Sequence, residues 1–211
     1  MIGVMLSWCY TTVNRGVFMK RLYFKYGVMG SSKSAQALMT AFNYRQRGFK
    51  VMLLKPIIDT RDHDVTNPAI SSRIGLKEKC ITFERDTNLF NLVQSNNGVQ
   101  VVIVDESQFC TTSQIDELKE LTMHDIVVLC YGLKTNFKSE LFEGSKRLLE
   151  LAESIQEIKS ICRCGNKATF NALIVNGRVT TEGAEIQIGG DEKYEAMCYA
   201  CYTKYQHEDC K

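Results

Sequence analysis

Residues 25–39, KYGVMGSSKSAQALM, constrain the fold most, because they place a glycine-containing loop between an apolar segment and a helical one. The loop opens at Gly27 and closes at Lys33 and Ser34, as in the pattern G-x-x-x-x-G-K-[ST]. Ser32 takes the place of that pattern's second glycine. In such loops backbone N–H groups bind phosphate, the lysine reaches the β- and γ-phosphates and the hydroxyl binds Mg²⁺. A small-residue turn with an incidental lysine is the alternative for this stretch alone.

Apolar, β-branched runs alternate with longer helical patterns along the chain, which predicts an α/β fold with a mostly parallel sheet. We expect strands at residues 21–26, 50–54, 100–104 and 126–130, and helices at residues 34–47, 112–121 and 143–152. The last two strands are continuous apolar runs, as expected for strands that are buried on both faces. Pro56 should end the second strand, and the polar residues 59–76 are expected to form a long loop.

The composition is that of an ordinary globular protein of 211 residues, with 45% hydrophobic and 24% charged residues. A formal charge of +2 is too small to indicate nucleic acid or an anionic membrane as a partner. Residues 1–18 lack the positive segment of a signal peptide, and their apolar run breaks at Asn14 and Arg15, short of the roughly 20 residues that span a membrane. We expect an unstructured extension or the product of an upstream start codon, with an anchor or functional arm as the alternative.

Two carboxylates follow a predicted buried strand, since residues 101–104 (VVIV) run into Asp105 and Glu106. In phosphate-loop enzymes, an aspartate at the end of a neighbouring strand helps to hold Mg²⁺. Because the chain turns at a strand end, Asp105 is free to face the metal while Glu106 faces an acceptor hydroxyl and takes its proton. The alternative is that the pair begins a solvated loop. Together with the phosphate loop, the pair favours nucleotide chemistry.

Nine cysteines occur in the chain, and four of them form two close pairs, Cys162 with Cys164 and Cys198 with Cys201. Such pairs in a chain with no evident secretory signal indicate reduced thiols and a cytosolic protein. Four thiolates complete a tetrahedral zinc site without a position for water, which predicts a structural metal. Free buried cysteines or a redox pair are the alternatives. Residues 176–193 are rich in glycine and polar residues, so we expect a metal-clipped lobe that carries a long loop.

The stretches VDESQF, CYGLKTNFKSELF, SSRIGL, CRCGNKAT and EIQIGGDEKYEAMCYACY resemble the type II thymidine kinases, and they extend from about residue 21 to residue 202. The single-residue spacer of the first cysteine pair and the pattern CYGL-x-T-x-F are most similar to the enterobacterial-type branch. The resemblance implies a P-loop NTPase-like parallel sheet in residues 19–160 and a small zinc-binding β lobe with a lasso loop in residues 161–211. It also implies a cytoplasmic homotetramer that transfers the γ-phosphoryl group of ATP to the 5′-hydroxyl of thymidine, gives dTMP and is inhibited by dTTP.

The resemblance also implies roles for individual residues. Glu106 matches the general base that takes the proton from the 5′-hydroxyl, and Asp105 with Ser34 would hold Mg²⁺. The residues expected to bind the nucleotide are Gly27, Val28, Met29, Gly30, Ser31, Ser32, Lys33, Ser34, Asp105, Glu106, Ser107 and Gln108. The residues expected around thymidine are Met29, Phe109, Leu133, Phe137, Gln187, Ile188, Gly189 and Tyr194. In this family the lasso binds the base largely through main-chain groups.

Three of the departures from the family pattern near the expected active site bear on its chemistry. Ser32 replaces a glycine, and a serine forced into a left-handed conformation costs about 1–2 kcal/mol, whereas at a negative φ a serine would be tolerated. The family's T-D-F-R-G is TNFKS at residues 135–139, so that Asn136 removes a negative charge and Lys138 lacks the bidentate fork of arginine. These changes bear on turnover and not on the fold, and a weak or inactive member that senses nucleoside or dTTP is the alternative to an active thymidine kinase. A nucleic-acid module built on the zinc lobe is disfavoured, because that lobe is not notably basic.

Overall fold

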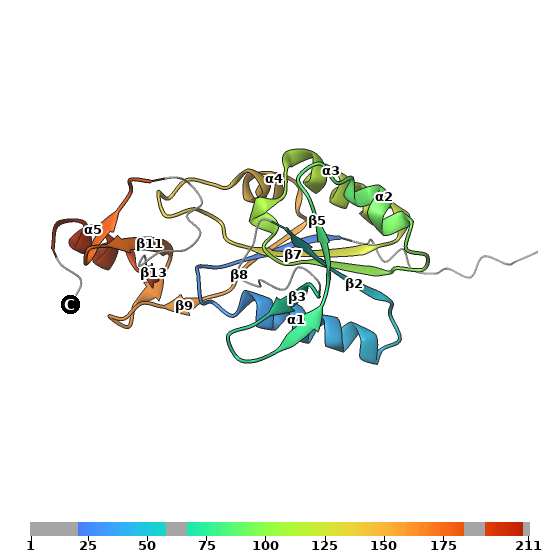
Figure 1. Cartoon of the computed structure of the whole chain (residues 1–211), viewed down its shortest axis with the longest axis horizontal. Helices are drawn as coiled ribbons and strands as arrows, with labels where there is room; N and C mark the ends of the chain where they lie inside the picture. Colours follow the sequence, from blue (N-terminus) through green and yellow to red (C-terminus); the bar gives the residue numbers. More distant parts are fainter. Residues whose placement is uncertain (1–20, 58–66, 184–192, 209–211) are drawn as a thin grey trace, which may run out of the picture.

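The computed structural model describes residues 21–57, 67–183 and 193–208. The expectations for residues 1–18 and for Gln187, Ile188 and Gly189 therefore lie outside the described residues. Figure 1 shows a larger body, whose central sheet has helices on both faces, and a smaller lobe at one end that carries the C-terminal part of the chain. Among the helices of the described residues, none is long and apolar enough to span a membrane.

The central sheet has six strands in the order β5-β2-β6-β7-β1-β8, and every neighbouring pair is parallel. The strands are β1 (Leu22–Tyr26), β2 (Val51–Pro56), β5 (Ile81–Phe83), β6 (Val101–Val104), β7 (Val127–Gly132) and β8 (Ser154–Glu157). This arrangement confirms the predicted α/β fold. The two edge strands, β5 and β8, were not predicted from the sequence. Because all six strands are parallel, their carboxyl ends meet at one edge, where the phosphate loop and the two carboxylates follow β1 and β6.

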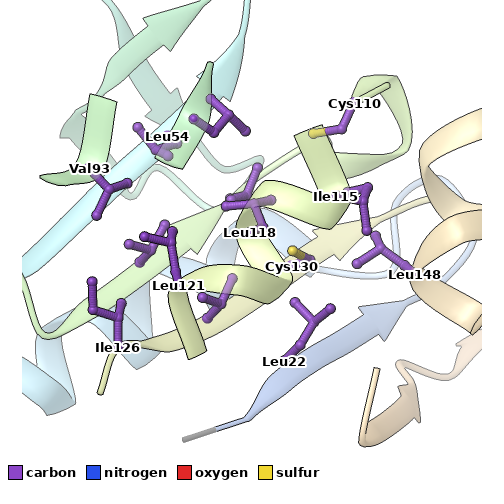
Figure 2. Close-up of a cluster of buried hydrophobic side chains, with 14 of the residues drawn as sticks. Leu22, Leu54, Val93, Cys110, Ile115, Leu118, Leu121, Ile126, Cys130 and Leu148 are labelled. Atoms are coloured by element: carbon purple, nitrogen blue, oxygen red, sulfur yellow. The ribbon is translucent and has the colours of Figure 1, made fainter. Parts of the chain in front are cut away.

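Helices cover both faces of this sheet. They are α1 (Lys33–Gln46), α2 (Leu89–Gln94), α3 (Thr112–Leu121) and α4 (Glu143–Leu151), with short 3₁₀ turns η1 (Ser107–Phe109) and η2 (Thr122–His124). Alternate side chains of β6 enter two separate clusters, Val101 and Ile103 with α1, and Val102 and Val104 with α2, α3 and α4. Figure 2 shows the second cluster, in which side chains of α3 and α4 are directed onto those of the strands.

Helix α3 matches its predicted bounds because its first turn is capped. The Thr111 hydroxyl accepts a hydrogen bond from the Gln114 N–H, and the Gln114 side chain accepts one from the Thr111 N–H. This reciprocal capping box satisfies two N–H groups that would otherwise lack partners at the helix start. Leu118 and Leu121 of the same helix are fully buried, and burial of each such side chain contributes about 1.5–3 kcal/mol.

The predicted long loop at residues 59–76 is wrong over its second half. Strand β3 (Ala69–Ser71) pairs antiparallel with β4 (Lys77–Lys79), and Gly75 turns the chain between them with a φ of +87°. Ile70 is fully buried against the α1 side of the sheet, which anchors this hairpin to the body. Strands of three residues are too short to show a period of two, so the sequence pattern did not reveal them.

The smaller lobe contains two small sheets and a helix. Its elements are β9 (Ser160–Ile161), β10 (Lys167–Ala168), β11 (Phe170–Val175), β12 (Arg178–Thr180), β13 (Lys193–Met197) and α5 (Tyr199–His207). Strands β12 and β13 both pair antiparallel with β11, as expected for a β lobe, whereas helix α5 was not predicted. Val28 of the phosphate loop lies in the same buried cluster as Ala172 and Met197 of the lobe, so the lobe packs directly against that loop.

Candidate active site and metal centre

The phosphate loop connects β1 to α1, and its lysine is held inside it. Lys33 is the first residue of α1 and is only 8% exposed. Its Nζ donates to the carbonyl of Val28 at 2.9 Å and to that of Gly27 at 3.4 Å. The hydroxyl of Ser31 is buried without a hydrogen-bond partner in the part of the chain that the structure describes. The loop therefore presents a cation and a spare hydroxyl at the N-terminus of a helix, where phosphate groups bind.

Of the two backbone conformations left open for a serine at this position, Ser32 has the left-handed one, with φ 64° and ψ 22°. A second serine, Ser139, has a φ of 67° and occupies the glycine position of the pattern T-D-F-R-G. The sequence comparison with that pattern did not single out Ser139. At each position, a serine side chain in this region costs about 1–2 kcal/mol relative to a right-handed conformation. Both loops thus contain backbone strain that a glycine would not have.

A cation also lies beside the loop from outside it. Arg73 is in the turn between β3 and β4, and a Cβ atom built on Gly30 would lie 3.5 Å from its Nη1. Gly30 itself has a φ of +74°, which an ordinary side chain would disfavour. The hairpin therefore brings a guanidinium to the phosphate loop. Arg73 was not predicted as a site residue.

The two carboxylates lie at the carboxyl end of β6, Asp105 at 2% and Glu106 at 7% exposure. Glu106 has a φ of 52°, so the chain reverses there and the alternation of the strand ends, as predicted. Burial and, to a smaller extent, the charge of Glu106 raise the pKa of Asp105 to about 7, against the hydrogen bond from Ser34 and the charge of Lys33. One oxygen of Asp105, Oδ1, has no hydrogen-bond partner among the described residues.

These oxygens fit a magnesium ion. Mg²⁺ prefers hard oxygen ligands and is usually held by one or two side chains together with substrate phosphates. Asp105 supplies a buried carboxylate with an unpartnered oxygen, and Ser34 supplies a hydroxyl that contacts this carboxylate. The buried charge and the unpartnered oxygen are both unfavourable without a cation, so the donor set suits one.

The side chains of Ser107 and Gln108 point to the end of β7. The Ser107 hydroxyl donates to the Tyr131 carbonyl at 3.0 Å. The Gln108 Nε2 donates to Glu106 Oε2 at 2.7 Å, and the Gln108 Oε1 accepts from the Leu133 N–H at 3.0 Å. Both side chains thus have protein partners in this structure, and their expected role in nucleotide binding stays a prediction.

The loop after β7 is organised by Asn136, which is 3% exposed. Its Oδ1 accepts from the N–H groups of Lys138 at 2.9 Å and of Glu140 at 3.0 Å. Its Nδ2 donates to the Glu140 carboxylate at 3.4 Å. An aspartate could accept the same two hydrogen bonds but would bring a second negative charge to Glu140. Asn136 therefore keeps the loop geometry, and the charge that it lacks is not needed for the loop to form.

Of the residues expected around thymidine, the structure brings Phe137 and Tyr194 together, with ring centroids 6.4 Å apart at an angle of 64°. Phe137 is 2% exposed, and Lys138 Nζ lies 5.8 Å from its ring. The ring of Phe109 contacts Phe142 instead, at 5.6 Å. Met29 and Leu133 are half-buried at the ends of the phosphate loop and β7.

Two polar residues of the smaller lobe, both missed in the sequence, contact the active-site loops. Asn171 accepts from the Met29 N–H at 2.8 Å and donates to the Thr135 carbonyl at 2.9 Å. The Tyr202 hydroxyl donates to the Phe137 carbonyl at 3.0 Å. The only sequence signal for Asn171 is a polar residue inside an apolar strand, and the pattern alone does not show which loops it would meet.

The four paired cysteines come together in the smaller lobe, with their sulfur atoms within 4.8 Å of one another. A tetrahedral zinc with Zn–S distances of about 2.3 Å requires sulfur atoms about 3.8 Å apart, so the cluster can hold such a metal. The Asn166 N–H and hydrogen bonds from the other three thiols lower the pKa of Cys164 to about 6, whereas hydrogen bonds with the other thiols raise the pKa of Cys201 to about 12. These opposite shifts reflect protons shared among thiols, which a metal would displace.

The chain is similar to known thymidine kinases along most of its length. The family model "Thymidine kinase" matches residues 20–202. The thymidine kinase of Legionella pneumophila (strain Lens) is 43% identical over 192 residues, which are 88% of this chain and 90% of that protein. That of Rhodopirellula baltica is 41% identical over 185 residues, 85% of this chain and 86% of that protein. That of Zymomonas mobilis is 42% identical over 185 residues, 85% of this chain and 94% of that protein.

Among solved structures, Pif1 helicase from Candida albicans has a TM-score of 0.40 and 14% identity, over 68% of this chain and 37% of that chain. This likeness is too slight to support an argument on activity. The match of the family model and the identity to full-length relatives are extensive, and the chain belongs to the thymidine kinase family.

Proposed function

We propose that the protein is an ATP-dependent thymidine kinase, which converts ATP and thymidine to ADP and dTMP. One observation supports this most strongly: the general-base candidate Glu106 lies at the same sheet edge as the phosphate loop, in a chain of the thymidine kinase family. A phosphoryl group held by the loop and a hydroxyl aligned by Glu106 would meet at this edge. Phosphoryl transfer leaves little covalent work to the protein, so positioning and charge stabilisation supply most of the catalysis.

The residues divide into two sets of roles. On the donor side, the loop N–H groups and Lys33 bind the phosphates, and Arg73 adds positive charge beside Gly30. Ser34 and Asp105 would hold Mg²⁺, which when bound neutralises charge on the phosphates. On the acceptor side, Glu106 takes the proton from the 5′-hydroxyl of thymidine as the new bond forms.

The thymidine pocket is proposed to lie beside the loop after β7. The rings of Phe137 and Tyr194 would flank the base, with Met29, Leu133 and Phe109 around it. The lasso residues Gln187, Ile188 and Gly189 are proposed to bind the base through main-chain groups. A structural zinc on the four cysteines would fix the lobe from which this lasso extends, because such sites contribute folding energy outright.

Several finer features remain proposals on the strength of the family alone. They are a homotetramer, inhibition by dTTP, a cytoplasmic location, and the division into a nucleotide-binding domain at residues 19–160 and a lasso domain at residues 161–211.

A weak enzyme that mainly senses nucleoside or dTTP is the second candidate, and the left-handed serines Ser32 and Ser139 favour it. Product analysis separates the two. We expect purified protein with Mg²⁺, ATP and thymidine to form ADP and dTMP in a 1:1 ratio, with adenosine as a control acceptor. Binding of thymidine without any dTMP would favour the sensor.

A further inference from the structure

Gln108 is in contact with the general-base candidate and is itself buried. It lies in η1, two residues after Glu106, and is 2% exposed. Its Nε2 donates to the Glu106 carboxylate at 2.7 Å, and its Oε1 accepts from the Leu133 N–H at 3.0 Å. Both ends of the amide are therefore engaged at once.

These partners allow only one orientation of the amide. A flipped Gln108 would place its oxygen against the Glu106 carboxylate and its NH₂ group against the Leu133 N–H, which gives two repulsive contacts. A hydrogen bond to a charged carboxylate is also stronger than one between neutral groups. Gln108 thus holds the carboxylate from a fixed direction.

The surrounding backbone keeps the glutamine in place. A Cβ atom on Gly132 would lie 2.7 Å from Gln108 Oε1 and 2.8 Å from Ser107 Oγ, so only glycine leaves room there. From the other side, a Cβ on Gly144 of α4 would lie 2.6 Å from the Ser107 carbonyl. The turn that carries Glu106 and Gln108 is enclosed between the end of β7 and the start of α4.

We infer that Gln108 is a positioning residue for catalysis, which aligns the Glu106 carboxylate with the nucleoside loop that begins at Leu133. This inference rests on the proposed function, in which Glu106 takes the proton of the acceptor hydroxyl. A misplacement of about 1 Å at a reacting group can cost about 100-fold in rate. Because Gln108 acts on the carboxylate that reacts, its loss should lower kcat and leave the KM for thymidine nearly unchanged.

The test uses full-length protein and two substitutions that separate the two ends of the amide. Gln108→Met keeps the length of the side chain and removes both hydrogen bonds. Gln108→Glu keeps an acceptor for the Leu133 N–H and removes the donor to Glu106. We expect both to lower kcat about 10- to 100-fold with a KM for thymidine within about twofold of wild type.

Gln114 provides a matched control, because it is equally buried at 2% and its amide donates to backbone carbonyls, that of Glu84 at 2.9 Å among them, and not to Glu106. Gln114→Met should lower the thermal midpoint as much as Gln108→Met does, yet leave kcat within about twofold of wild type. A fall in kcat of the same size in both variants would make the effect one of stability and overturn the inference.

A double variant tests whether Gln108 acts through Glu106. In a Glu106→Gln background, Gln108→Met should cost less than about twofold in kcat, since the group that it positions is gone. Full additivity, an unchanged kcat in either Gln108 variant, or a change confined to KM would overturn the positioning role. Wild-type protein that forms no dTMP would instead overturn the proposed function and this inference with it, so the two failures are distinguishable.

Discussion

Asn171 of the smaller lobe and Met29 of the phosphate loop are joined by a hydrogen bond of 2.8 Å, from the Met29 N–H to the Asn171 Oδ1. The other end of the same side chain donates to the carbonyl of Thr135, in the loop after β7. One buried amide thus links the lobe to both the donor and the acceptor side of the proposed site. Tyr202 adds a second link through the Phe137 carbonyl.

Asn171→Leu should impair both substrates together. It removes the partner of the Met29 N–H and of the Thr135 carbonyl, at a cost of about 1–3 kcal/mol. We expect the KM values for ATP and thymidine to rise together by about 5- to 100-fold, as measured by steady-state kinetics. Asn96→Leu is the control, because Asn96 donates to the Leu92 carbonyl far from these loops. Unchanged KM values in Asn171→Leu would show that the hydrogen bonds of Asn171 do not contribute to substrate binding.

Ser32→Gly should stabilise the protein. Glycine adopts a φ of 64° without steric cost, but it loses more backbone entropy on folding than serine does. We therefore expect the free energy of unfolding to rise by up to about 1 kcal/mol. Urea unfolding measures it, and Ser139→Gly should behave similarly. Ser32→Ala is the control, since it keeps the strained Cβ and removes only the hydroxyl. If strain or crowding limits the loop, Ser32→Gly also raises kcat, whereas lower stability in this variant would contradict the strain argument.

The protein should contain about one zinc per chain as purified, by elemental analysis. Cys164→Ser removes one of four clustered thiols and should lower that content, while Cys80→Ser, outside the cluster, should not. Cys198 and Cys201 lie at the start of α5, which also carries Tyr202. Removal of the metal by a chelator should therefore displace Tyr202, whose hydroxyl donates to the Phe137 carbonyl. Because Phe137 belongs to the proposed thymidine pocket, we expect the KM for thymidine to rise. A content well below one zinc per chain in wild type would contradict the metal site.

Stability should depend on pH through Asp105, measured without added Mg²⁺ or nucleotide. Its pKa of about 7 in the folded protein exceeds the roughly 3.9 of an unfolded aspartate, so the folded state binds the proton more tightly. Stability from this group is then present at low pH and is lost as the pH rises to about 7. As the pH rises from 5.5 to 8, the free energy of unfolding of wild type, measured with urea, should fall by about 2 kcal/mol relative to that of Asp105→Asn. A constant difference between the two proteins would contradict the raised pKa.

The sequence predicted the central architecture well because local patterns determine it. Continuous apolar runs identified β6 and β7, and the helix expected at residues 112–121 has the bounds of α3. The comparison with the loop pattern also raised a left-handed Ser32 as one of two alternatives, because that pattern has glycine there. In each case the informative residues are neighbours in the chain.

What the sequence did not reveal depends on contacts between distant segments. The amide of Gln108 was expected at a nucleotide, yet it meets Glu106 and Leu133 because β6 and β7 are adjacent in the sheet. Asn171 looked like one polar residue in an apolar strand until the fold brought Met29 and Thr135 to it. The hairpin of β3 and β4 was missed because strands of three residues show no period.

The most direct measurement compares ATP-dependent phosphorylation of thymidine by wild type and by Glu106→Gln, together with thymidine binding by calorimetry. We expect wild type to turn over within the range of about 1–100 s⁻¹ that is typical of kinases. Glu106→Gln should lose about 100- to 10,000-fold in kcat and keep its affinity for thymidine, because only the proton acceptor is gone. Equal turnover by the two proteins would contradict the assignment of Glu106 as the base.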